Sequence, residues 1–326
     1  MKNVVLCYPL HPNGMALLEG RPDITLRHLS RPSEAEFGAA LADAHSVLVA
    51  LEGIGERELA QAPALEIISR FGVGYDAIDI PACTRRGVAV GVTNGGNDLA
   101  VAEHTLGLML AVARRTIEMD AIVRTGRWRE RGGRAMGELA GRTVLVVGYG
   151  RIGARVARLC AAFGMNVMVC DPAFPTPRIA ADGYRPVTDI AAALPEVDVL
   201  TLHCPLSERT RRLINREMLS LLKPSAWLIN AARGGLVDED ALAEALGAGK
   251  LEAAGLDVLV QEPPEPGNRL FALPNVVLSP HVAAAPIETF EKMSIRAARN
   301  IIDMFDGALD PGYVVNPEVL PNRPNA

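Results

Sequence analysis

The sequence predicts an α/β protein of two domains, each built on a parallel β-sheet. Short runs of β-branched and aliphatic residues alternate with helical patterns along most of the chain, as βα units require. The chain has 326 residues, which is more than one hydrophobic core usually serves. A glycine-rich turn between a strand and a helix begins a second series of these units near residue 148.

Composition excludes several classes of protein. A formal net charge of −5 gives no reason to expect nucleic acid or an anionic membrane as a partner. The five cysteines are scattered and form no C-x-x-C pair, so neither a disulfide framework nor a zinc site is predicted. The first residues are too short an apolar run for a signal peptide, and no run reaches the about 18 apolar residues of a spanning helix. We therefore expect a soluble, cytoplasmic protein without metal.

The first domain is predicted from residues 1 to about 97. Its strand candidates are Val4–Leu6, Ile24–Leu29, Ser46–Val49, Leu65–Ser69 and Val88–Val92. Their spacing suits βα units, so a small parallel sheet with its own core is expected.

A long helix is predicted next, because apolar residues from Leu99 to Ile117 recur three and four positions apart. Asp98 suits its start and Gly126 its end. Such a helix fits either a strut between domains or an ordinary core helix. The segment that follows is basic, with Arg124, Arg127, Arg129, Arg131 and Arg134 around Trp128. It fits either a solvated loop or a subunit contact, since Trp and Arg are enriched at interfaces.

The second domain resumes the alternation and lasts to about Pro280. Its strand candidates are Thr143–Val147, Asn166–Cys170, Val197–His203, Trp227–Asn230, Ala253–Val258 and Val276–Leu278, and its helix candidates are Arg151–Phe163, Asn215–Leu222 and Asp238–Leu246. Six strands complete a doubly wound sheet, which leaves the helical tail from Ile287 to Met304 without a role there. We predict that the tail returns to the first domain. The domains are then 1–97 plus 285–326, and 98–284.

Three glycines predict a dinucleotide site. Gly148, Gly150 and Gly153 follow the strand Thr143–Val147 with the spacing G-x-G-x-x-G, and a helical pattern starts at once. The glycines allow a tight turn, a close approach to a pyrophosphate and close helix packing, and the helix N-terminus favours phosphate. Asp171 ends the next strand about 20 residues on, where a carboxylate would accept the ribose 2′-hydroxyl and repel a 2′-phosphate. NAD is therefore predicted over NADP.

Three side chains with complementary chemistry follow neighbouring strands of this domain. Arg233, Glu262 and His281 each come shortly after a strand candidate, and ligands of open α/β sheets bind beyond the carboxyl ends of the strands. Hydride transfer at an alcohol carbon requires a proton to leave or join its oxygen, and histidine exchanges protons near neutral pH. A carboxylate orients the imidazole and stabilises its charged form, and arginine can clamp a substrate carboxylate.

On these residues the chain resembles the D-isomer-specific 2-hydroxyacid dehydrogenases along essentially its whole length. The matching segments are Val101–His104, Gly148–Gly153, His203–Leu206, Asn230–Gly234, Leu256–Val258 with Glu262–Pro264, and Pro280–His281. The resemblance implies a Rossmann NAD domain inserted into a smaller, flavodoxin-like substrate domain. It also implies a homodimer joined through the segment near Trp128.

The resemblance also implies roles for individual residues. Arg233 should hold and polarise the 2-oxo acid, and His281, paired with Glu262, should be the acid/base. Arg151 and Ile152 should meet the pyrophosphate. The remaining residues expected along the cofactor are Gly148, Gly150, Gly153, Asp171, Cys204, Pro205, Ala231 and Asp257. The backbone amides of Val73 and Gly74, in a glycine loop of the first domain, should meet the substrate carboxylate.

Departures from the family bear on the substrate. Formate dehydrogenases carry glutamine where this chain has Glu262, and phosphoglycerate enzymes usually have an arginine where this chain has Ala50 and Leu51. Asp98 would also repel a phosphate. These positions favour a small unphosphorylated 2-oxo acid such as hydroxypyruvate or glyoxylate. The alternative from another class is an NAD(H)-sensing binding protein without turnover, resembling transcriptional corepressors of this architecture.

Overall fold

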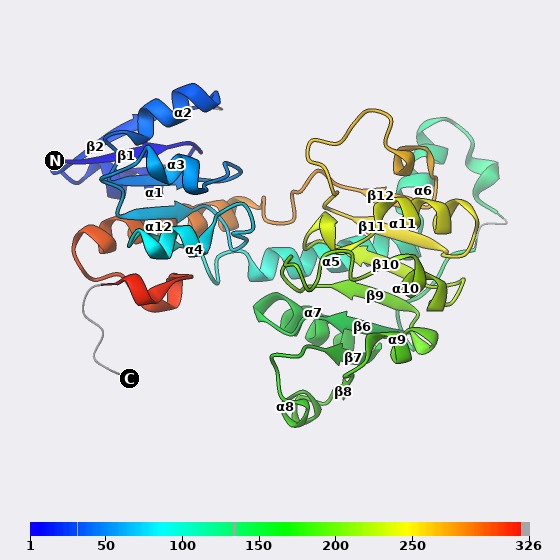
Figure 1. The fold of residues 1–326 in the computed structure, drawn as a ribbon. Helices are drawn as coiled ribbons and strands as arrows, with labels where there is room; N and C mark the ends of the chain where they lie inside the picture. Colours follow the sequence, from blue (N-terminus) through cyan, green and yellow to red (C-terminus); the bar gives the residue numbers. More distant parts are fainter. Residues whose placement is uncertain (31, 133–134, 321–326) are drawn as a thin grey trace. The chain divides into compact units, whose positions relative to one another are not determined.

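The computed structural model describes residues 1–30, 32–132 and 135–320 (Figure 1). It divides into two compact units. Unit 1 is Met1–Asn97 with the C-terminal segment that begins at Ala284, and unit 2 is Asp98–Ala283. Each unit carries one sheet whose strands all pair in parallel, so the predicted α/β fold class is confirmed.

The sheet of unit 1 has five strands in the order β2-β1-β3-β4-β5, the flavodoxin-like order. They are β1 (Lys2–Leu6), β2 (Ile24–His28), β3 (Ser46–Val49), β4 (Ile67–Arg70) and β5 (Ala89–Gly91). Its α-helices are α1 (Pro12–Glu19), α2 (Glu34–Leu41), α3 (Glu56–Ala60), α4 (Ile80–Arg85) and α12 (Ile287–Phe305), and its 3₁₀ turns are η5 (Pro311–Tyr313) and η6 (Pro317–Val319). Strand β3 is buried throughout, as expected when helices cover both faces of a parallel sheet.

The C-terminal helix α12 belongs to the core of unit 1. Met293, Ala297 and Ile301 lie on one of its faces and pack with Leu6 and Phe71 of the sheet side. The hydroxyl of Ser69 on β4 donates to the carbonyl of Ala297 at 2.9 Å, which ties the helix to the sheet. Residues almost 300 positions apart thus share one hydrophobic core.

The sheet of unit 2 has seven strands in the order β12-β11-β10-β9-β6-β7-β8 (Figure 1). They are β6 (Thr143–Val147), β7 (Asn166–Cys170), β8 (Arg185–Pro186), β9 (Val199–Leu202), β10 (Trp227–Asn230), β11 (Ala253–Leu256) and β12 (Val276–Leu278). The order is that of a Rossmann sheet with one strand added at the β12 edge. The six-strand prediction missed β8, whose two residues include a proline and carry no apolar run.

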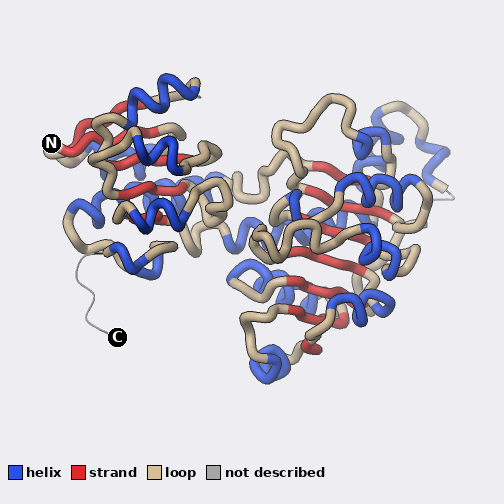
Figure 2. Tube along the Cα trace, viewed as in Figure 1, coloured by secondary structure: helices blue, strands red, loops and turns tan. Residues whose placement is uncertain are grey.

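The helices of unit 2 cover both faces of this sheet (Figure 2). They are α5 (Asp98–Ala113), α6 (Thr116–Arg124), α7 (Arg151–Ala162), α8 (Thr176–Ala181), α9 (Ile190–Ala193), α10 (Arg216–Leu221) and α11 (Glu239–Gly247), with 3₁₀ turns η1 (Trp128–Arg131), η2 (Leu194–Glu196), η3 (Gly234–Leu236) and η4 (Arg269–Ala272). Leu145, Leu200 and Leu228 lie in the core on one face, and Val144, Val199 and Trp227 in the core on the other. Burying each such side chain stabilises the fold by roughly 1.5–3 kcal/mol.

The single long helix predicted from Leu99 to beyond Ile117 is wrong. Arg115 adopts a left-handed backbone conformation, with φ at 48°, and separates α5 from α6. The guanidinium of Arg115 donates to the carbonyl of Ala135 and pairs with Glu118 across the break. No sequence pattern marks a non-glycine residue that adopts this conformation. The apolar pattern continues across Arg115, so it predicted one unbroken helix. Among the described residues, no helix is both long enough and apolar enough to cross a bilayer.

Candidate functional site

The turn after β6 is built by two close approaches of backbone. Gly148 has φ at +99°, and a Cβ there would lie 2.6 Å from the backbone of His203 and Cys204. A Cβ on Gly153 would lie 1.9 Å from the carbonyl oxygen of Gly148. Neither position tolerates a side chain, so both glycines are needed to bring β6, β9 and α7 together.

The middle glycine differs because it faces open space. A Cβ on Gly150 would meet nothing within 4 Å, and no side chain caps α7, which begins at Arg151 and Ile152. The first-turn N–H groups of this 12-residue helix therefore meet no capping side chain. A pyrophosphate fits this arrangement, since it needs close backbone approach and a helix N-terminus.

Asp171 lies beside the same turn, directly after β7. Its carboxylate accepts the Tyr149 N–H at 2.6 Å and the Ala173 N–H at 2.8 Å. The acid predicted to meet a ribose is thus hydrogen-bonded to the residue between the first two glycines. Each carboxylate oxygen retains a further lone pair for a hydroxyl group.

Cys204, Pro205 and His203 follow the end of β9. No role was assigned to His203 from the sequence. Burial raises the pKa of the Cys204 thiol to about 11, so it is an inert lining group. The imidazole Nε2 of His203 lies 2.8 Å from the Thr201 hydroxyl, while its Nδ1 is buried without a partner among the described residues. Burial lowers the pKa of His203 to about 3, which keeps the ring neutral beneath the turn.

Arg233 follows β10, and its loop is pressed against the loop after β11. A Cβ on Gly234 would lie 2.0 Å from the backbone carbon of Leu259, so only glycine permits this packing. The Arg233 guanidinium donates to the carbonyl of Ala232 at 2.7 Å. Ala231, the preceding lining residue, is buried. The packing brings the loop of Arg233 beside the loop that carries Glu262.

The side chains of His281 and Glu262 are hydrogen-bonded to each other, the pairing that the family resemblance implied. The Nδ1 of His281 lies 2.6 Å from Oε2 of Glu262, and the second carboxylate oxygen accepts the Leu259 N–H at 3.0 Å. The side chains remain 40% and 34% exposed, so a small molecule can reach the pair.

The Glu262 carboxyl is held in its ionised form. Burial acts to raise its pKa, but the hydrogen bond and charge of His281 outweigh this effect. The Leu259 N–H and the positive charge of Arg233 add to the same direction, so the pKa of Glu262 is lowered. Arg233 is therefore close enough to act electrostatically on the pair.

Asp257, directly after β11, holds the segment that carries His281. Its carboxylate accepts the N–H groups of Val282 and Ala283, both at 2.9 Å, and the Ser279 hydroxyl at 2.6 Å. Its own carbonyl accepts the His281 N–H at 2.7 Å. The sequence assigned Asp257 to the cofactor path and assigned Ser279 no role.

The predicted residues fall in both units. Arg233, Glu262, His281 and the predicted cofactor residues lie in unit 2, around the carboxyl ends of its strands. Val73 and Gly74 lie in unit 1, in the loop that follows β4. In that loop Gly72 has φ at +141°, and its carbonyl accepts the Thr93 N–H. A shared site for the two sets stays a prediction.

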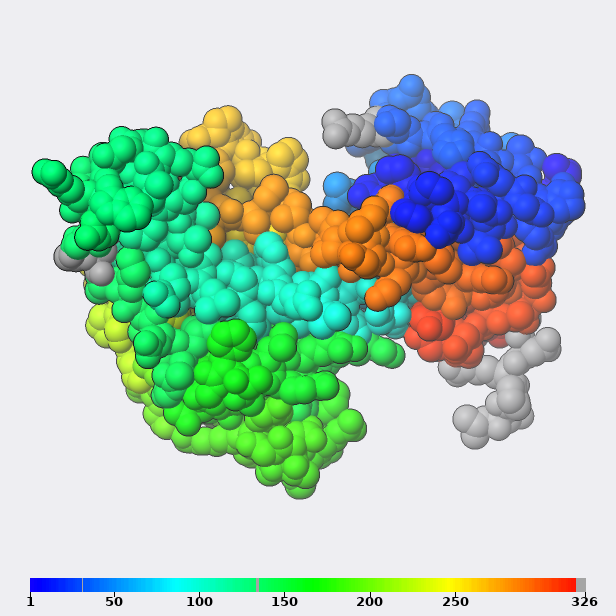
Figure 3. Space-filling model, turned by 180° about the vertical axis from the view of Figure 1, so that it is seen from behind, coloured from blue at the N-terminus to red at the C-terminus, as the bar shows by residue number. Residues whose placement is uncertain are grey.

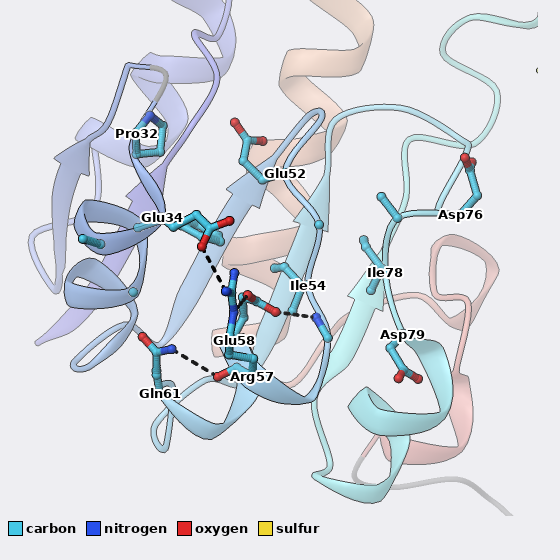
Figure 4. A pocket seen from close by; sticks show the side chains of 16 residues that line it. Pro32, Glu34, Glu52, Ile54, Arg57, Glu58, Gln61, Asp76, Ile78 and Asp79 are labelled. Carbon is cyan, nitrogen blue, oxygen red and sulfur yellow. Dashed lines mark hydrogen bonds and ion pairs between the residues drawn. The ribbon is translucent and has the colours of Figure 1, made fainter. Parts of the chain in front are cut away.

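An acidic groove of about 940 Å³ lies elsewhere in unit 1, between α2, α3 and residues 76–79 (Figure 4). Four of its acidic side chains make contacts that stabilise the fold. Glu34 and Glu58 pair with Arg57, and the Glu52 carboxylate accepts the N–H groups of the two residues before it. Asp79 caps α4. The groove contains none of the predicted catalytic residues, so we do not assign the reaction to it.

No cluster of three or more His, Cys, Asp or Glu side chains within residues 1–30, 32–132 and 135–320 is arranged to hold a metal ion. The five cysteines are all free thiols.

Comparison with known proteins identifies the family. The pattern of the D-isomer specific 2-hydroxyacid dehydrogenase NAD-binding domain matches residues 106–283. Glyoxylate reductase from Thermofilum pendens is 39% identical over 318 residues, which cover 95% of this chain and 93% of that protein. D-3-phosphoglycerate dehydrogenase from Archaeoglobus fulgidus is 42% identical over 79% of this chain, but the match spans only 49% of that longer protein.

Comparison with solved structures supports the same family. The NADPH-dependent glyoxylate/hydroxypyruvate reductase from Sinorhizobium meliloti, solved with NADP and malonate, has a TM-score of 0.88 at 30% identity and covers 99% of both chains. The TT0316 protein from Thermus thermophilus has a TM-score of 0.86 at 35% identity, covering 96% of this chain and 99% of that one. The chain therefore belongs to the D-isomer specific 2-hydroxyacid dehydrogenase family, as predicted, and is a nicotinamide-dependent oxidoreductase of 2-hydroxy acids.

Proposed function

We propose that the protein is an NAD-dependent reductase of a small, unphosphorylated 2-oxo acid, with His281 as the acid/base. The observation that carries this proposal is the 2.6 Å contact between His281 Nδ1 and the Glu262 carboxylate, beside Arg233. When bound, the nicotinamide supplies or accepts the hydride. The residues of this chain orient the substrate and move the proton.

In this proposal the two nitrogens of the imidazole have different tasks. Glu262 is ionised and can only accept, so His281 must donate its Nδ1–H to it. The other nitrogen, Nε2, then carries the exchangeable proton, which it gives to the substrate oxygen during reduction and removes during oxidation. The carboxylate stabilises the imidazolium and fixes the ring, as in a catalytic triad.

Arg233 is proposed to bind the substrate carboxylate and polarise the 2-oxo group. A guanidinium offers planar, paired donors that match a carboxylate, and its fixed charge stabilises the alkoxide that forms on reduction. We infer that the backbone amides of Val73 and Gly74 also bind the substrate carboxylate. In this proposal residues 1–97 plus 285–326 form the substrate domain and residues 98–284 the dinucleotide domain.

We propose that NAD is bound at the turn after β6. Arg151 and Ile152 at the start of α7 would hold the pyrophosphate above Gly148, Gly150 and Gly153. Asp171 would accept the ribose hydroxyl. Cys204, Pro205, Ala231 and Asp257 would line the remaining path.

Replacement of Asp171 by alanine is expected to relax the preference for NAD over NADP. The carboxylate accepts the ribose 2′-hydroxyl and repels a 2′-phosphate, so its loss should lower the ratio of kcat/KM for NADH to that for NADPH by about 10- to 100-fold. Steady-state kinetics with both cofactors measure this ratio. Asp182→Ala, which removes a nearby carboxylate that accepts the Tyr149 hydroxyl, is the matched control. An unchanged ratio would mean that the ribose is bound elsewhere.

The substrate proposal rests on Ala50 and Leu51 after β3, where the related phosphoglycerate enzymes usually have arginine, and on the buried acid Asp98. Relatives named glyoxylate reductase support it. The test is NADH oxidation with glyoxylate, hydroxypyruvate, pyruvate and 3-phosphohydroxypyruvate. Preference for the phosphorylated acid would overturn the substrate proposal, and NADH binding without turnover on any acid would favour a sensor.

We propose further that the protein is a cytoplasmic homodimer joined through α6 and η1. The apolar side chains of Ile117, Val123 and Trp128 are 63%, 54% and 59% exposed there, and a second copy would cover them. Figure 3 shows this green segment at the surface of unit 2. Arg131 lies over the Trp128 ring, and Arg134 lies outside the described residues. Sedimentation of Trp128→Glu should show a monomer where the parent chain is a dimer. Cell fractionation tests the cytoplasmic location, which five free thiols support.

A further inference from the structure

We infer that His104 and Ser279 are positioning residues for His281, acting through the buried carboxylate of Asp257. The inference rests on the proposed role of His281 as acid/base. It adds two residues that never need to touch the substrate. All the residues involved lie in unit 2, so their contacts are internal to that unit.

A chain of hydrogen bonds links helix α5 to the segment that bears His281. His104 Nε2 lies 2.9 Å from the Ser279 hydroxyl and 3.3 Å from Oδ1 of Asp257. The Ser279 hydroxyl lies 2.6 Å from the same Oδ1. The Asp257 side chain is fully buried, whereas that of His104 is 26% exposed.

The protons in this chain can be assigned by counting donors. Ser279 has one hydroxyl proton and donates it to Oδ1 of Asp257. The hydroxyl oxygen must then accept from His104, so His104 carries a proton on Nε2. The same Nε2–H also faces Oδ1 of Asp257. His104 therefore lies at the end of this chain of donors to the buried carboxylate.

Asp257 holds the backbone of the residues that follow His281 through this carboxylate. Oδ1 accepts the Val282 N–H, Oδ2 accepts the Ala283 N–H, and the Asp257 carbonyl accepts the N–H of His281 itself. His281 has φ at 54°, a left-handed conformation that is unfavourable for a residue with a side chain. Such a conformation persists only where surrounding bonds over-determine it, and these three bonds do so.

The functional consequence follows from the direction of the imidazole. Without the hydrogen bond from Ser279 or His104, the Asp257 carboxylate can rotate toward other donors. Its hydrogen bonds to the backbone of residues 282 and 283 then weaken. The Nε2 of His281 then samples positions away from the substrate oxygen, and small misplacements of a proton donor slow chemistry strongly. Substrate binding depends on other groups, so kcat should fall while KM changes little.

The test uses four variants of the full-length enzyme, assayed with NADH and the best 2-oxo acid of the substrate panel. His104→Leu and Ser279→Ala should each lower kcat about tenfold and change KM less than twofold. His104→Gln keeps a donor at the position of Nε2, and Ser279→Thr keeps the hydroxyl. Both should restore kcat to within about threefold of the parent, a rescue that a purely structural role would not require.

A double variant tests whether the residues act as one chain. His104→Leu with Ser279→Ala should lower kcat by about the same factor as either change alone, because residues in one network are not additive. His28→Leu and Ser220→Ala change an exposed histidine and an exposed serine elsewhere and should leave kcat unchanged.

His281→Ala, assayed in parallel, distinguishes a failure of the proposed function from a failure of the positioning inference. If it keeps the parent kcat, the proposed function fails. If it loses turnover while His104→Leu and Ser279→Ala keep the parent kcat, only the positioning inference is overturned. Loss of kcat without rescue by the conservative variants would also overturn it.

Discussion

Replacement of His281 by alanine should lower kcat about 10³-fold while leaving NADH binding within about threefold of the parent, since general acid/base catalysis typically contributes 10²- to 10⁴-fold. In the proposed function its imidazole exchanges a proton with the substrate oxygen. Within the described part of the chain its hydrogen bonds go to Glu262 and to the backbone of Asp257 and Ser279, and not to the turn of Gly148–Gly153. Kinetics across a pH range and titration of NADH fluorescence measure the two quantities separately.

Two further variants make this result specific. His281→Asn keeps a polar side chain but cannot carry an exchangeable proton near neutral pH, so it should be as inactive as His281→Ala. Glu262→Gln keeps the shape of the carboxylate but removes the charge that stabilises the imidazolium. It should retain more activity than His281→Ala. Near-normal kcat for His281→Ala at every pH would remove His281 from the proton transfer.

The fold and much of the candidate site could be predicted because their signals are local in sequence. Alternating apolar strands and helical stripes gave the two parallel sheets. The glycine spacing anticipated the close backbone approaches that the structure shows at Gly148 and Gly153. Glu262 and His281 were predicted to lie near each other because both follow neighbouring strands, whose carboxyl ends share one edge of a sheet. Their pairing was implied by the family resemblance, and the structure shows the contact.

Other features could not be predicted because no local pattern marks them. The break at Arg115 depends on a left-handed residue held by Ala135 and Glu118. The neutral state of His203 depends on burial under a turn that begins more than fifty residues earlier. The bond between His104 and Ser279 joins positions 175 residues apart. Long-range contacts of this kind fix the state of a side chain through residues that are distant in sequence.

Replacement of Arg233 by alanine is the second change from which a large effect is expected. It should lower kcat/KM for the 2-oxo acid about 10³-fold, because in the proposed function Arg233 both clamps the substrate carboxylate and places a positive charge beside the alkoxide. Loss of a single donor to such an oxyanion already costs about 10²- to 10³-fold. Arg233→Lys should recover only part of the loss, since a lysine cannot form the planar, paired contact. NADH titration should remain within about threefold of the parent.

The position of Arg233 beside Glu262 yields a second readout for the same variant. Its charge helps to lower the pKa of the Glu262 carboxyl, so its removal should raise that pKa. A raised pKa means that Glu262 loses its charge at a higher pH as acid is added. The residual activity of Arg233→Ala should therefore decline at a higher pH than that of the parent. Added guanidinium, which restores the charge without the tether, should recover part of kcat and move the decline back toward the parent value. Retention of kcat/KM by Arg233→Ala would instead assign the substrate carboxylate to another cation, and the chemistry proposed for this edge of the sheet would have to be abandoned.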